Sequence, residues 1–173
     1  MDKALQPMIE MNEKIWDGLR KDLSDVGPDE ADWRPLPQAN SINVIVRHLR
    51  IEAEWKLASL EHGEQEPSEL TPAIQQFIDS VPMNFEQNLK KLDELCTRFN
   101  AVLRESFSED LEKRSSLVYK GYPAVSPYSL FFHHPMHQAM HWGQIRTIRT
   151  LYLKTRGEPV PEGFFPDNPS YPK

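Results

Sequence analysis

The feature that most constrains the fold of this chain is the spacing of its apolar side chains, which recur every three or four residues over four long segments. This spacing follows the 3.6-residue turn of an amphipathic helix, and no convincing run alternates with the two-residue period of a strand. The segments run from about 3 to 25, 40 to 63, 84 to 107 and 126 to 157. The sequence therefore predicts an all-α fold with four long helices.

Capping residues mark the starts of three of these segments. Asn40 or Ser41 is placed to cap the second helix and Asn84 the third, because short polar side chains accept bonds from the unpaired amides of a first turn. The fourth helix is predicted to start near Ser126-Pro127, where a cap precedes a proline at the first helical position.

The links between the segments are long. We expect residues 26–40, rich in proline and aspartate, to form an ordered loop pinned by Trp33. In the link from 64 to 83, Thr71 followed by Pro72 predicts one short helix. Four amphipathic helices indicate a four-helix bundle over residues 1–157. The proline-rich residues 158–173 are expected to form a tail that packs on the body or on a partner.

Composition narrows the classes of function. The 173 residues are 39% hydrophobic and 27% charged, which suits one globular domain. A net charge of -6 argues against nucleic acid and anionic lipid as partners, and no apolar run approaches the roughly 20 residues of a membrane helix. The charged N-terminus lacks the pattern of a signal peptide, and the single cysteine, Cys96, is predicted to be a buried structural thiol. A cytoplasmic location is expected.

Four of the six histidines lie within residues 133–141. At about 100° per residue, His137 and His141 fall about 40° apart on the helical face that Leu130 and Ile148 mark as apolar. This face should point into the bundle. Side chains one turn apart stack on the same side of a helix, so the two imidazoles can reach one metal ion together.

His48 of the second helix also lies on an apolar stripe, with Glu52 one turn further on. Three histidines from two helices can meet in a bundle core, which is a common place for metal sites. Three neutral imidazoles leave at least one coordination position open for water or substrate. Zinc, nickel or iron would accept such ligands, and imidazole alone does not select among them.

Two alternatives stay open from the residues alone. The histidines could be core side chains with satisfied nitrogens in a purely structural helical domain. They could also hold a metal for stability in a module that binds a small ligand or a partner without catalysis.

Pro135 cannot donate to the carbonyl of Phe131 and should kink the helix just before His137. We therefore expect His133 and His134 at the rim of the site, with His133 the better candidate for lining it.

The stretch from His137 to Ile145 resembles the HxxxH-x-GQI signature of the DinB/YfiT-like superfamily. The GQI extension is more specific than two histidines one turn apart. Further matches in the same order, from about Met8 to Leu153, are Trp33-Arg34-Pro35, Ser41-Ile42, His48 and Glu54-Trp55.

The resemblance implies a four-helix bundle with up-down-down-up topology and a divalent metal held by His48, His137 and His141. Members of the superfamily with known activity are metal-dependent S-transferases that use low-molecular-weight thiols such as bacillithiol or mycothiol, or related isomerases, and many are dimers. Many other members have no assigned reaction. This chain departs from the pattern at Trp142, where a basic or small residue is more usual, and at Pro135.

The expected function is that of a metal-dependent enzyme acting on a small molecule, either a thiol S-transferase or a hydrolase, with a homodimer as a further expectation. Glu52 is a candidate general base. Gln144 is a candidate to orient His141, and His133 and Trp55 are candidates to line the pocket.

Two further expectations concern the rest of the fourth helix. Gly143 is expected to permit the close approach of a neighbouring helix. Arg146 and Arg149 are expected on the solvent side or in the late turns, where cations are favourable.

Overall fold

The computed structural model describes residues 2–62, 72–109 and 127–160, and these ranges hold six named helices. The helices are α1 Gln6–Leu23, α2 Pro28–Asp32, α3 Ile42–His62, α4 Pro72–Ser80, α5 Phe85–Glu105 and α7 Pro127–Arg156. The four long ones match the four segments that the apolar spacing predicts. None of the described helices is long and apolar enough to cross a membrane.

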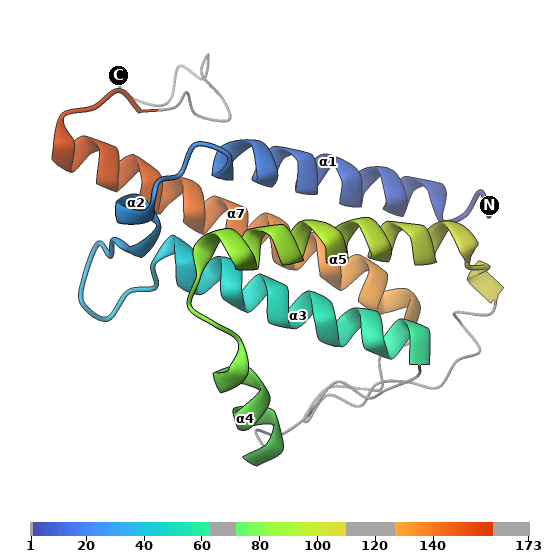
Figure 1. Ribbon diagram of the computed structural model, residues 1–173. Coiled ribbons are helices and arrows are strands. Elements are labelled where there is room, and N and C mark those ends of the chain that lie inside the picture. Colours follow the sequence, from blue (N-terminus) through green and yellow to red (C-terminus); the bar gives the residue numbers. More distant parts are fainter. Residues whose placement is uncertain (1, 63–71, 110–126, 161–173) are drawn as a thin grey trace.

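The four long helices form one bundle. Figure 1 shows α1 and α7 running in one direction along the bundle axis and α3 and α5 running in the other. Helix α1 packs on α5 and α7, and α3 packs on the same two helices from the other side. This arrangement confirms the up-down-down-up topology. It also makes α3 and α7 antiparallel neighbours, which places the two histidine-bearing helices face to face.

The core contains apolar side chains from all four helices. Leu19 of α1, Ile45 of α3, Leu92 of α5 and Ile145 of α7 belong to one buried cluster, and none is more than 2% exposed. A second cluster packs Met8 and other residues of α1 and its N-terminal approach against α3 and α5. Burying one such side chain contributes about 1.5–3 kcal/mol relative to leaving it in water. The scaffold therefore has a large source of stability apart from the histidines.

The helix ends follow the predicted caps. Asn84 Oδ1 accepts the Gln87 amide hydrogen at 2.8 Å, and Ser41 Oγ accepts that of Val44 at 3.3 Å. Helix α7 ends at Arg156, and the next residue, Gly157, has a φ of 68°, the left-handed conformation that favours glycine. The Glu158 amide then bonds back to the Leu153 carbonyl oxygen at 2.9 Å, which closes the helix end.

The long links contain the two short helices. Residues 26–40 were expected to form a loop, but they include α2, which starts with Pro28 at its first position. Five residues are too few to show a helical period, so the sequence pattern could not reveal this turn and a half. Trp33 follows α2 and meets the Tyr152 ring edge to face at a centroid distance of 5.7 Å, which confirms that it pins the link to the body.

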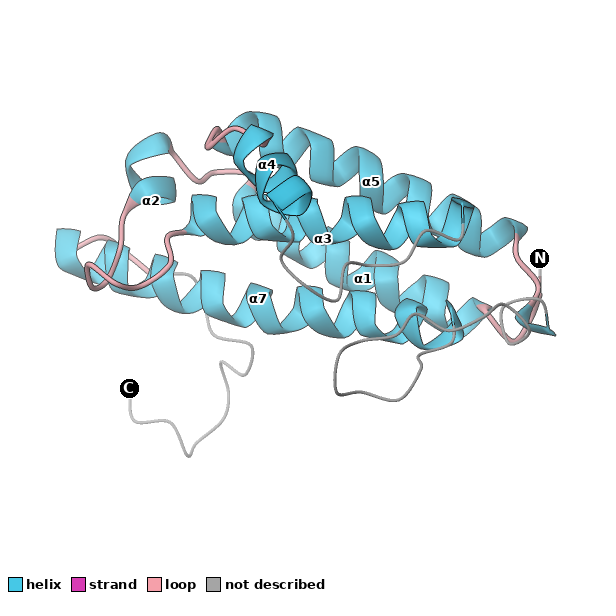
Figure 2. Ribbon diagram, turned by 90° about the horizontal axis from the view of Figure 1, so that it is seen from below, coloured by secondary structure: helices cyan, strands magenta, loops and turns pink. Residues whose placement is uncertain are grey.

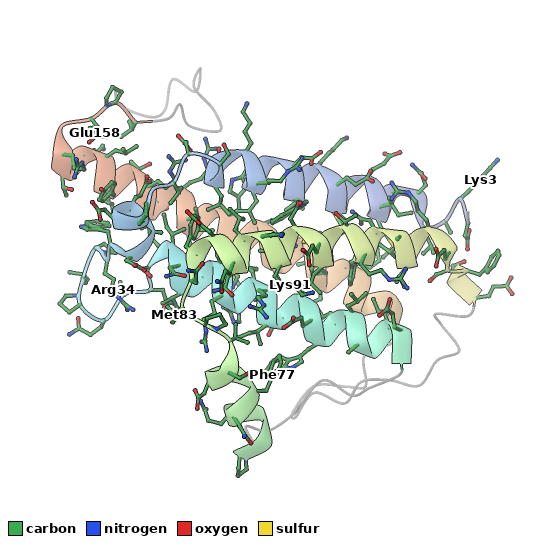
Figure 3. All side chains as sticks on the ribbon, viewed as in Figure 1. Lys3, Arg34, Phe77, Met83, Lys91 and Glu158 are labelled. Carbon is green, nitrogen blue, oxygen red and sulfur yellow. The ribbon has the colours of Figure 1, made fainter. Side chains whose placement is uncertain are left out.

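Helix α4 is the short helix predicted after Thr71, and it lies outside the four-helix bundle (Figures 1 and 2). Its Phe77 side chain leaves α4 on the side of α3 (Figure 3) and packs against Trp55 with the ring centroids 5.9 Å apart. Residues 161–173, most of the predicted tail, lie outside the described residues. The division of the chain at residue 157 stays a prediction.

Candidate metal centre

The three histidines singled out in the sequence converge between α3 and α7. His137 Nε2 lies 3.2 Å from His48 Nε2 and 3.0 Å from His141 Nε2. Each of the three rings offers a nitrogen, and these nitrogens all lie within 4.8 Å of one another. The helical period of the sequence therefore predicts the correct helix face for all three side chains, and the fold brings them to the same depth in the bundle.

The donor set fits a divalent transition metal. Two imidazole nitrogens bound at about 2.0–2.1 Å to one tetrahedral ion lie about 3.3 Å apart, close to the two separations given above. Three histidines with a position left over are the ligand pattern of an open site, and imidazole suits zinc, nickel and iron alike. The group could hold a metal ion, and its geometry does not select which one.

Gln144 fixes the tautomer of one of the three rings. His141 Nδ1 lies 2.8 Å from Gln144 Oε1. Because the amide oxygen can only accept, His141 Nδ1 carries the hydrogen and Nε2 keeps its lone pair. That lone pair points to the side of His137, as a metal ligand requires. This contact is the one that an orienting role for Gln144 needs.

The surroundings keep two of the rings neutral. Burial lowers the pKa of His48 below its usual range. Burial, assisted by the positive charge of Lys56, lowers the pKa of His137 to about 3. Neutral imidazole is the form that binds a metal, so neither ring must lose a proton near neutral pH before it can act as a ligand.

His133 and His134 lie on different sides of α7. The helix continues through Pro135. His133 is exposed and stacks on His137 with the ring planes 16° apart and centroids separated by 5.4 Å, so it lies on the side of the centre. His134 is only 4% exposed and packs on Phe99 of α5 at a centroid distance of 4.1 Å. The expectation that His134 lies at the rim is wrong, because it is turned into the core.

A short polar network surrounds His134. Gln138 Nε2 lies 3.1 Å from His134 Nε2 and 3.1 Å from the Cys96 sulfur. Cys96 is 3% exposed, which confirms the predicted buried thiol, and burial raises its pKa to about 12. The thiol therefore stays protonated and serves packing and hydrogen bonding.

Glu52 lies on the face of α3 that carries His48, and its carboxylate pairs with Lys56 at 2.8 Å. Burial acts to raise the pKa of Glu52, but the pKa is lowered on balance, chiefly by the charge and hydrogen bond of Lys56. Glu52 is thus ionised near the three histidines, as a proton acceptor must be. Trp55 packs against Phe77 on α4, and its place in the lining of the pocket stays a prediction.

Lys56 is the residue near this centre that the sequence reasoning missed. Its side chain is 0% exposed, whereas lysine is almost never fully buried unless it is paired. A signal was present in the sequence, because His48, Glu52 and Lys56 follow one another at one-turn intervals and must share a helix face.

A shallow hollow of about 630 Å³ lies beside the centre. Gln144, Gly143 and Met140 of α7 line one side, and Ile45 of α3 and residues 35 and 39–40 of the preceding link line another. The hollow combines apolar surface with amide groups, as small-molecule sites do. Gln144 connects it to the histidines through its bond with His141.

The bundle topology and the three-histidine group together define a DinB-like helical protein. A sequence model of the family described as mycothiol-S-transferase matches residues 10–153, and the chain belongs to that family. Among solved structures, a conserved protein from Enterococcus faecalis shares the fold with a TM-score of 0.67. It is 17% identical, and the match covers 89% of this chain and 99% of that one. No curated protein matches the chain.

Proposed function

We propose that the protein is a metal-dependent thiol S-transferase whose metal ligands are His48, His137 and His141. The observation that carries the proposal is the convergence of three imidazole nitrogens within 4.8 Å on the inner faces of α3 and α7. Membership in the mycothiol S-transferase family supports the reaction class. The proposed thiol is mycothiol or another low-molecular-weight thiol, and the proposed location is the cytoplasm.

A divalent ion bound by the three histidines would supply a Lewis acid that lowers the pKa of a thiol. The residues of the chain do the remaining work. Glu52 accepts the proton of the thiol. The sulfur then forms a bond to the electrophilic carbon of the acceptor, whose leaving group departs with the bonding electron pair.

The hollow beside Gln144 is the proposed place for the organic part of a substrate. Its volume of about 630 Å³ lies in the range of small-molecule sites, which is roughly 300–1,000 Å³. Asn40 and Gln144 offer amide groups to a polar substrate, and Ile45 and Met140 offer apolar contact. His133 is proposed to border the site on another side, and its exposure and its stacking on His137 support this role.

The first experiment measures metal and activity together. Protein purified without added metal is analysed for its metal content, and the metal-loaded protein is then supplied with mycothiol, bacillithiol or cysteine and an alkyl or aryl halide. We expect about one metal ion per chain and a thioether product detected by mass spectrometry. The His137→Ala variant should lose both, whereas His133→Ala, a matched change one turn away, should keep the metal.

A second assay, with an ester or an amide and no thiol, separates this function from its alternatives. A hydrolase would release product from an ester or amide without any thiol. A non-catalytic module would bind the metal and show no turnover with any acceptor. Failure of the unaltered protein to bind Zn²⁺, Ni²⁺, Fe²⁺ or Co²⁺ would contradict the proposal altogether.

A further inference from the structure

Three side chains of α3 face three levels of α7. His48, Glu52 and Lys56 lie at successive turns of α3. The His48 ring meets the rings of His137 and His141 at centroid distances of 5.0 and 4.9 Å. Because the two helices are antiparallel, each further turn along α3 faces an earlier turn of α7. Glu52 therefore lies one helical turn away from the three-histidine centre along α3, and Lys56 lies two turns away.

The electrostatic effects along α7 agree with this order. The negative charge of Glu52 acts on His48, His137 and His133. The positive charge of Lys56 acts on the same three rings and also on the more distant His134. Both charged groups of the Glu52–Lys56 pair therefore lie near the three-histidine centre.

Lys56 is enclosed and Glu52 is not. The Lys56 side chain is 0% exposed and that of Glu52 is 14% exposed, with 2.8 Å between the ammonium nitrogen and the carboxylate oxygen. Beyond this ion pair, the ammonium has no hydrogen-bond partner among the described residues. Replacing a buried ion pair by apolar side chains is often neutral or stabilising, so stability alone does not account for a lysine here.

A carboxylate at this position is a potential fourth ligand. Residues at i and i+4 of a helix can reach one ion, and carboxylate oxygen binds zinc as imidazole nitrogen does. A set of three histidines and one glutamate would fill a tetrahedral site and close it, as in structural centres. An S-transferase needs that position for its thiol, so something must keep Glu52 off the metal.

We propose that Lys56 is a positioning residue that holds the Glu52 carboxylate beside the three-histidine centre and outside its coordination shell, so that a thiol can enter. This inference rests on the proposed function. Lys56 gives Glu52 a permanent charge partner at the end of the site away from His141. Glu52 stays close enough to receive a proton and does not compete with the thiol for the metal.

The test uses Co²⁺, whose visible absorption reports coordination number and ligand type. Metal-free protein is titrated with Co²⁺, and 2-mercaptoethanol is then added. In the unaltered protein we expect the thiol to change the cobalt spectrum, because one position is open. In Lys56→Met we expect Co²⁺ to bind at least tenfold more tightly and the spectral response to the thiol to be lost. Circular dichroism checks that each variant is folded.

Two further variants separate positioning from simple charge repulsion. Lys56→Arg keeps a cation and should respond to the thiol as the unaltered protein does. The double variant Lys56→Met/Glu52→Gln lacks the competing carboxylate and should regain the thiol response. If loss of the response persists in the double variant, Lys56 does not act through Glu52 and the inference is overturned.

The remaining outcomes are also decisive. If Lys56→Met does not fold, Lys56→Gln, which can still donate one hydrogen bond to Glu52, should show a reduced thiol response; an unchanged response overturns the inference. If the unaltered protein binds no Co²⁺, the metal centre itself is disproved. If it binds Co²⁺ and responds to thiol, and Lys56→Met behaves identically, only the role of Lys56 is disproved.

Discussion

His134 is a neutral ring held in the core by its hydrogen-bond partner. The Gln138 amide nitrogen is 3.1 Å from both His134 Nε2 and the Cys96 sulfur, so it donates one hydrogen to each acceptor. A proton on His134 Nε2 would face that donor. Burial, together with the positive charge of Lys56, lowers the pKa of His134 well below its usual range. The ring must therefore gain its proton on unfolding when the pH is low.

This protonation predicts a loss of stability in acid. Below the unfolded pKa of about 6.5 the unfolded chain binds a proton at His134 that the folded chain does not, so the free energy of unfolding falls as pH falls. The contribution of one such group is roughly 1.2 kcal/mol per pH unit between pH 6 and pH 5. Urea denaturation of metal-free protein at several pH values measures the slope. His134→Gln, which stays neutral, should be less steep by that amount.

Gln144 offers a test of ligand orientation in a single side chain. Gln144→Met removes the acceptor for His141 Nδ1–H while keeping a similar volume. Loss of such a partner typically reduces metal affinity about 10- to 100-fold. Co²⁺ titration should show this reduction. Thr147→Ala, a change nearby on the same exposed side of α7, should leave the affinity within about twofold. Equal affinities for Gln144→Met and the unaltered protein would contradict the role.

At the scale of single residues, the sequence predicts the place of those side chains for which the direction around the helix axis is enough. The helical period places His48, His137 and His141 on inner faces, and the fold then aligns them. The one-turn spacing places Lys56 on the face of His48 and Glu52, but it does not predict that Lys56 is buried, because a lysine on a helix is expected to reach solvent and its burial depends on what α7 places opposite it. His134 was misplaced because a proline kink was assumed to turn it outwards.

At the scale of whole helices, the contact between α1 and α7 depends on one glycine. A Cβ atom on Gly18 of α1 would lie 2.2 Å from the nearest ring carbon of Trp142 on α7. The ring cannot move freely, because its Nε1 donates to Asp22 Oδ2 at 2.6 Å. Trp142, one of the two residues that depart from the superfamily pattern, is thus accommodated by Gly18. A Cβ on Gly143 would meet nothing within 4 Å among the described residues, so the close approach expected there is not found.

The two glycines predict opposite effects of the same substitution. Gly18→Ala should lower the free energy of unfolding, since overpacking costs about 1–3 kcal/mol and exceeds the gain in helix propensity of at most about 1 kcal/mol. Gly143→Ala should raise it by up to about 1 kcal/mol. Urea denaturation of both metal-free variants checks the pair. A Gly18→Ala protein as stable as Gly143→Ala would show that α1 and α7 adjust without cost.

The elements that the sequence predicted are those with enough turns to display a period and a cap. Helix α2 has neither, and its omission affected Arg149. That arginine was expected on the solvent side or in the late turns, but it is 6% exposed and pairs with Glu30 of α2 at 2.7 Å and with Asp25 at 2.9 Å. The sequence pattern does not predict these acidic partners, because they come near Arg149 only when the link folds back on α7.

For the whole molecule, the central question is whether the bundle needs a metal in order to fold. The main buried cluster draws on α1, α3, α5 and α7, and none of its members is a histidine. The second cluster lies along α1, α3 and α5 and includes Phe99 and Leu103. A structural metal site contributes the folding free energy of domains that lack such a core. This bundle has its own core, so the three histidines are free to serve binding.

The metal-free protein should therefore be folded and should melt cooperatively, whereas a structural site would leave it unfolded. A metal that binds only the folded state at 100 times its Kd adds about 2.7 kcal/mol, which corresponds to a rise in Tm of roughly 5–11 °C for a domain of this size. Thermal melts by circular dichroism, with chelator and with added Zn²⁺ or Ni²⁺, measure both quantities. His137→Ala should melt without the metal-dependent rise. If the unaltered protein has no cooperative melt in chelator, the metal bound by the histidines is required for folding. That result would contradict the proposal of an open, preformed site in an enzyme.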